Sequence, residues 1–101
     1  MSIREEIVNE INELYKLSRQ ADSYEQYLEI TQLISQKESQ LTHLLRAQLD
    51  SNDEGYQKAL DAAKKATKVA KEAIEDTKKT VKYFEKGEKA FKLLALLLRF
   101  H

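Results

Sequence analysis

The chain has 101 residues, of which 34% are charged, and its 17 basic and 17 acidic side chains balance to zero. This length fits one domain with a modest core, and the lack of cysteine excludes disulfides and thiolate metal sites. Because proline is absent, glycine is rare and good helix formers dominate, the composition excludes a sheet protein and predicts a single all-α domain over residues 1–101.

The first predicted element is a helical arm over about residues 2–50. Its apolar residues recur at helical spacing up to Leu28, and they recur again from Ile30 with a change of phase. A run of six polar residues, 35–40, interrupts the second stretch. We expect the core to be thinnest at that run, where it faces the alanine-rich part of the second arm.

Two patterns in the first arm are typical of helix N-termini. They are Ser23-x-x-Gln26 and Ser35-x-x-Glu38, in which the serine caps the backbone and the longer side chain reaches back. The arm is therefore expected to be one kinked helix or two helices, with residues 21–23 as a candidate break.

A turn is predicted over about residues 51–55, within the only cluster of turn formers in the chain. Asp53 or Ser51 is expected to cap the helix that follows. The turn lies at the midpoint, so folding back there would pair the two arms almost end to end, with residue n opposite residue 105 − n.

The two halves of the chain carry opposite net charge, which favours their packing side by side. Residues 1–50 hold five basic and nine acidic side chains, whereas residues 51–101 hold twelve and eight. Two unbroken arms would form an antiparallel helical hairpin about 70 Å long. Kinked arms would give three or four helices instead.

The second arm, over about residues 56–100, follows a seven-residue repeat when Tyr56 is placed at position a. In this frame every lysine of the arm falls at an outward position, b, c or f: Lys58, Lys64, Lys65, Lys68, Lys71, Lys78, Lys79, Lys82, Lys86, Lys89 and Lys92. The frame passes through Gly87 without a slip, so Gly87 is expected inside a helix, although a separate final helix is an alternative.

Four positions in seven of the second arm, a, d, e and g, are largely apolar. Such a face is too wide for a two-stranded seam and indicates a helix packed between several neighbours. We therefore expect the hairpin to dimerise into a four-helix bundle.

The segment 91–100 differs from the rest of the arm because its outward positions are also apolar, at Leu93, Leu96 and Phe100. An exposed patch of this size is typical of an interface. Self-association, burial in the chain's own core, and docking to another protein or to a membrane surface are all open. The residues predicted to form the interaction surface are Ile3, Ile7, Phe84, Phe91, Leu93, Leu94, Leu96, Leu97, Leu98 and Phe100.

No cofactor, metal or catalytic residue is expected. The two histidines, His43 and His101, provide one imidazole per arm, which does not build a metal site. There is no glycine-rich phosphate loop and no spacing typical of a nucleophile with its base. Nucleic acid is not expected as a partner, because glutamates interrupt the lysine face and no aromatic or arginine side chains are interleaved with it.

The sequence thus predicts a non-catalytic structural or adaptor protein that forms a homo-oligomer, preferably a dimer, or docks a partner through its apolar C-terminal helix end. One alternative is a peripheral membrane-surface protein, since Lys86, Lys89, Lys92 and Arg99 flank the apolar segment. Another is a small binding protein of the immunity or antitoxin kind. The acidic N-terminal stretch lacks the features of a signal peptide, so we expect the cytoplasm.

Overall fold

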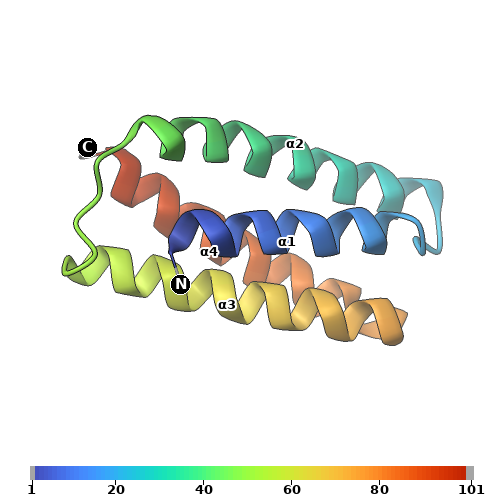
Figure 1. Ribbon diagram of the computed structural model, residues 1–101. Coiled ribbons are helices and arrows are strands. Elements are labelled where there is room, and N and C mark those ends of the chain that lie inside the picture. The colour runs from blue at the N-terminus through green and yellow to red at the C-terminus, as the bar shows by residue number, and fades with distance from the viewer. Residues whose placement is uncertain (1, 100–101) are drawn as a thin grey trace.

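The computed structural model describes residues 2–99 and is all-α, as predicted. Its elements are α1 (Ile3–Ser18), α2 (Tyr24–Arg46), α3 (Glu54–Glu75), the short 3-10 turn η1 (Thr77–Lys79) and α4 (Thr80–Arg99). Figure 1 shows α1 lying between α2 and α3, with α4 crossing behind at an angle. The four helices form a bundle within one chain, measuring 39 × 20 × 18 Å.

An unbroken hairpin of about 70 Å is therefore not formed, because each predicted arm folds back on itself. The four-helix version of the prediction is the one observed. The expected pairing of residue n with residue 105 − n is wrong for the first helix. The backbone N–H of Ile3 donates to the hydroxyl of Tyr56 at 3.2 Å, so the first turns of α1 and α3 lie together.

The first break separates α1 from α2, at the place where one of the two capping patterns predicted it. The Ser23 hydroxyl accepts from the N–H of Gln26 at 3.1 Å, and the Gln26 side chain accepts from the N–H of Asp22 at 2.9 Å. These bonds satisfy amides that a helix start leaves without partners. The second pattern, at Ser35, starts nothing and lies inside α2.

The second break, between α3 and α4, lies at Asp76 and not near Gly87, where a separate final helix was the alternative. Its position was not predicted, because the seven-residue frame runs across it. Asp76 is extended, with φ of −138°, and its carboxylate accepts from the N–H of Lys78 at 3.1 Å. Asp76, Thr77 and Thr80 are weaker helix formers than the glutamate and lysines next to them. Gly87 lies inside α4, as expected.

The connection between α2 and α3 covers residues 47–53, so α2 ends earlier than the predicted arm. Asp53 caps α3, accepting from the N–H of Gly55 at 2.7 Å, which confirms one of the two caps expected there. The acidic cap also suits the positive end of the helix dipole.

The core is centred on α3, which packs against both α1 and α4. The alanines of α3 let the helix axes approach closely, and larger side chains of α1 and α4 fill the space beside them. The lysines of α3 and α4 all lie on exposed positions except Lys86, which is half-buried. The outward frame predicted for them is therefore confirmed.

Candidate functional site

The predicted interaction residues are divided between the core and the surface. Four of them lie in the chain's own core: Ile3, Ile7, Leu94 and Leu97. Four others are half-buried: Phe84, Phe91, Leu93 and Leu98. Only Leu96 is clearly exposed, at 52%, and Phe100 lies outside the described residues. A docking role for residues 91–100 stays a prediction, but Leu94 and Leu97 of this segment are already buried in the bundle.

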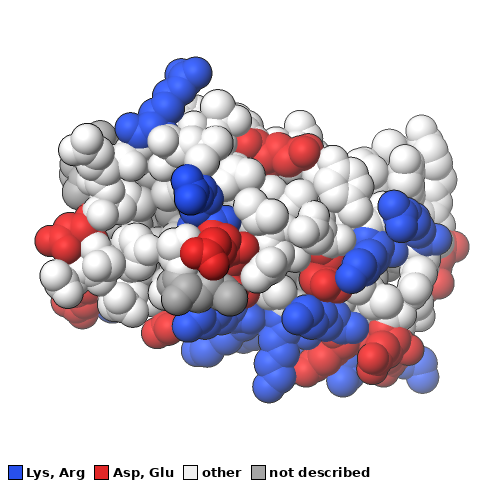
Figure 2. Space-filling model, in the orientation of Figure 1, with Lys and Arg blue, Asp and Glu red and all other residues white. Residues whose placement is uncertain are grey.

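Exposed apolar side chains gather instead on α1 and α2. Of the eight large hydrophobic residues that are exposed among residues 2–99, six belong to these two helices. We call them the α1/α2 face: Val8, Tyr15, Tyr24, Tyr27, Leu28 and Leu45. Figure 2 shows scattered charges within a broad uncharged area over α2 and α1, whereas charged side chains crowd along α3.

Contacts between the two helices make this face continuous. The hydroxyl of Tyr15 on α1 donates to Glu38 Oε2 on α2 at 3.2 Å. A shallow groove of about 400 Å³ joins Val8 on α1 to Leu41 and Leu45 on α2. The signal for this face was present in the sequence: the change of apolar phase after Leu28 leaves apolar residues on two sides of α2.

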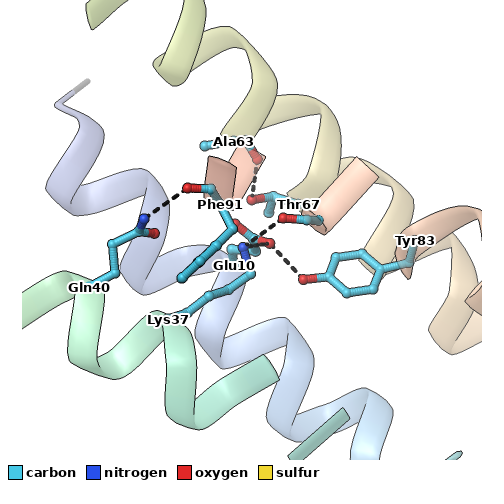
Figure 3. A network of polar contacts seen from close by, with 8 residues as sticks. Glu10, Lys37, Gln40, Ala63, Thr67, Tyr83 and Phe91 are labelled. Atoms are coloured by element: carbon cyan, nitrogen blue, oxygen red, sulfur yellow. Dashed lines mark hydrogen bonds and ion pairs between the residues drawn. The ribbon is translucent and has the colours of Figure 1, made fainter. Parts of the chain in front are cut away.

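Inside the bundle, polar side chains from three helices meet in the core (Figure 3). Lys37 of α2 forms an ion pair with Glu10 of α1, with 2.9 Å between Nζ and Oε2. The hydroxyl of Tyr83 on α4 donates to the same Oε2 at 2.6 Å. All three side chains are fully buried. Buried charges are expected only where they are paired in this way.

The same cluster ties α2 to α4. Lys37 Nζ also donates to the carbonyl of Gly87 at 3.1 Å, and the Gln40 amide donates to the carbonyl of Phe91 at 2.9 Å. Residues 35–40 were expected to face the alanine-rich helix, and that expectation is wrong. Two of the six, Lys37 and Gln40, point into the core against α4, where backbone carbonyls accept their hydrogen bonds.

Gly87 leaves the space that Tyr83 needs. A Cβ built at Gly87 would lie 2.8 Å from the Tyr83 ring and hydroxyl, too close for contact. The absence of a side chain therefore allows the tyrosine to lie against its own helix and reach Glu10. This packing role explains why a glycine, a poor helix former, lies in the interior of α4.

Burial dominates the electrostatics of the cluster. Removal from water raises the pKa of the Glu10 carboxyl above its usual value, outweighing Lys37 and the Tyr83 hydroxyl, which lower it. Burial, together with the Glu10 carboxylate, raises the pKa of Tyr83 well above its usual value. Perturbed groups of this kind occur at active sites, and also in structural ion-pair networks.

The geometry favours a structural role for the cluster. Glu10, Lys37 and Tyr83 have no exposed surface, and none of them lines the surface grooves between α1 and α2 or between α3 and α4. A dissolved substrate could not reach them without opening the bundle. The ion pair and the hydrogen bonds of the cluster hold α2 in position against α1 and α4.

A second surface lies between α3 and α4. One groove, of about 350 Å³, is lined by Lys58, Lys65, Lys86 and Lys89 together with Leu93. An adjoining groove of about 430 Å³ shares Lys58 and Leu93, and it is also lined by the acidic Asp53 and Glu54 and by the leucines Leu96 and Leu97. Basic and apolar side chains thus lie side by side near the C-terminal end of α4.

Within residues 2–99 no group of three or more histidine, cysteine or acidic side chains is placed to hold a metal ion. None of the four described helices combines the length and the apolar character required to cross a membrane. Comparison of the chain with family models, with curated proteins and with solved structures finds no match.

Proposed function

We propose that this chain is a non-catalytic, helical interaction protein that self-associates through its α1/α2 face. The observation that carries the proposal is the concentration of large exposed apolar side chains on that face. Exposed apolar patches rimmed by polar residues are typical of protein–protein interfaces. Leu28 and Leu45 are about half-exposed, so burying the rest of either side chain on association would contribute about 0.7–1.5 kcal/mol, half of the value for a fully exposed leucine.

A second copy of the chain is the partner that this surface suits best. A two-fold interface uses the same patch twice, so the apolar side chains of one copy meet those of the other. The tyrosines of the face add support, because aromatic residues are enriched at interfaces. Tyr24 and Tyr27 stack with ring centroids 6.3 Å apart, so together they offer a broad aromatic contact area.

The polar cluster in the core supports a role without catalysis. Its charges are directed at one another and at backbone carbonyls of α4 and are closed to solvent. Within residues 91–99, which the structure describes of the C-terminal segment, Leu96 is the one exposed large apolar side chain, and Phe91, Leu93 and Leu98 are half-buried. We therefore assign the main contact to the α1/α2 face and not to residues 91–100.

The test is the absolute mass of the protein, measured by light scattering behind a sizing column over a tenfold concentration range. Wild type should be a dimer at high concentration, and Leu28→Lys with Leu45→Lys should be a monomer. Leu96→Lys is the matched control, since Leu96 is exposed to 52% and Leu28 and Leu45 to 46% and 58%. A monomeric wild type, or loss of mass only in the control, would overturn the proposal.

The groove between α3 and α4 favours one other function, attachment to an anionic membrane surface. Four lysines and one acidic residue, Asp61, line it beside the half-buried Leu93. Basic residues next to apolar side chains are typical of interfacial helices. Co-sedimentation with vesicles containing anionic lipid tests this candidate. Wild type should pellet at low salt, and Leu93→Glu with Leu96→Glu should not; if wild type stays in solution, the membrane candidate is wrong.

A further inference from the structure

The exposed side of α2 carries a stripe of residues spaced alternately by three and four positions. Its members are Leu28, Thr31, Ser35, Glu38, Thr42 and Leu45, and each is exposed except Thr31, which is half-buried. The five steps average 3.4 residues, close to the repeat of three and a half by which two helices pack along their length. The stripe is about 26 Å long, most of the 39 Å length of the molecule.

The stripe reads the same in both directions. Counted forward from Leu28 the steps are three, four, three, four and three, and counted backward from Leu45 they are the same. An antiparallel copy of α2 therefore matches the stripe position by position, with residue n opposite residue 73 − n. No slip in register is needed to bring all six positions together.

The chemistry of the opposed positions matches as well as the spacing. Leu28 faces Leu45 of the second copy, and Thr31 faces its Thr42. Ser35 faces Glu38 of the second copy, where the hydroxyl can donate to a carboxylate whose other oxygen accepts from Tyr15. Small hydroxyl residues at the centre allow the helix axes to approach, and leucines close both ends.

Antiparallel pairing also avoids the repulsion that parallel pairing creates. In a parallel pair Glu38 would face Glu38 of the second copy, Arg46 would lie near its counterpart, and the two helix dipoles would be aligned. Each of these arrangements is unfavourable. In the antiparallel register Arg46 lies beside Tyr27 of the second copy, where a guanidinium can stack on the ring.

We infer that α2 pairs antiparallel with α2 of a second copy, with Leu28 against Leu45, Thr31 against Thr42 and Ser35 against Glu38. The inference rests on the self-association proposed above and specifies its geometry. Val8 and Tyr15 of α1 flank the pair and enlarge the contact.

Because the chain has no cysteine, engineered thiols report the register directly. Thr31→Cys and Thr42→Cys are made separately in the full chain, mixed at the concentration at which wild type is dimeric, and oxidised. The two thiols oppose each other in the proposed pair, whereas two copies of the same thiol lie about 17 Å apart along the axis. A disulfide requires Cα atoms within about 7 Å, so only the mixture should give a covalent dimer on a non-reducing gel.

The control is Lys68→Cys on the opposite, α3 side, which should not cross-link to Thr31→Cys. Self-cross-linking of either threonine variant would show parallel pairing and overturn the inference. A dimer by light scattering with no cross-link in the mixture would also overturn it, while leaving self-association intact. A monomeric wild type would overturn both.

Discussion

Helices α2 and α3 have almost the same length, 23 and 22 residues, but they are built differently. α3 buries nine residues, mostly alanines, and presents lysines to solvent. α2 buries only five, and two of those, Lys37 and Gln40, are polar. Its outer side carries tyrosines and leucines where α3 carries charge.

Comparing α2 with α3 shows how the two sides of a helix in a small bundle can differ. In α3, the side that packs in the core is mostly alanine, and the side that faces water is charged. In α2, directed polar bonds hold the inner side in place, and the outer side keeps apolar surface. We interpret α2 as the helix that faces inward for folding and outward for association.

The largest expected effect on stability comes from removing the charge of Lys37, which holds α2 in position. Lys37→Met leaves the Glu10 carboxylate buried without its partner and should lower the free energy of unfolding at neutral pH by about 3–5 kcal/mol. Urea denaturation measures the change. The double variant Glu10→Gln with Lys37→Met removes both charges and keeps an acceptor for Tyr83, so it should recover most of the loss. A double variant as unstable as the single one would contradict the assignment.

The second largest loss of stability is expected from Gly87→Ala in α4. The added carbon meets the buried Tyr83 ring at 2.8 Å, so the tyrosine must move away from Glu10, at a cost of about 1–3 kcal/mol. Gly55→Ala is the control, because its added carbon meets the Asp53 carboxylate at 3.1 Å and Leu97 at 3.4 Å and has more room. Thermal unfolding should show a clear loss only for Gly87→Ala, and equal stability of both variants would disprove the packing role.

The pH dependence of stability tests the role of the buried Glu10 carboxyl. Since burial raises the pKa of Glu10 in the folded state, its contribution to stability is fully present below the unfolded pKa and is lost as pH rises through the folded value. The free energy of unfolding of wild type should therefore fall relative to that of Glu10→Gln as the pH rises from acid to neutral. A difference that moves in favour of wild type would mean that attraction to Lys37 outweighs burial.

The smallest effect on folding is expected from Leu28→Lys. This residue is exposed in the single chain, so under dilute conditions its unfolding free energy should change by no more than about 0.5 kcal/mol. A larger loss under those conditions would show that Leu28 supports the chain's own fold. In that case its effect on mass would not report association.

Much of the fold follows from local signals in the sequence. Scarce breakers and abundant helix formers predicted the all-α class, Ser23 marked the first break and the lysine frame marked the outer side of α3 and α4. The second break, at Asp76, was missed because a repeat that continues across a short cap hides it. The apolar C-terminal segment is largely covered by the bundle because α4 folds back on α3, which an unbroken arm could not do.

The polar cluster could not be predicted, because its partners are far apart in the sequence. Lys37 lies in a run of six polar residues, and such a run is usually solvent-exposed. Its burial depends on Glu10 and on the carbonyl of Gly87, which meet it only once the bundle is formed. The apolar outer side of α2 was present in the sequence as a change of phase, but it was interpreted as a kink.

The most direct test of the central claim is backbone hydrogen exchange of the unmodified protein at two concentrations, one below and one above the range in which its mass increases. We expect amides of α1 and α2 to exchange more slowly at the higher concentration, while those of residues 93–99 do not change. Slower exchange confined to residues 93–99, or no dependence on concentration anywhere, would contradict association through the α1/α2 face.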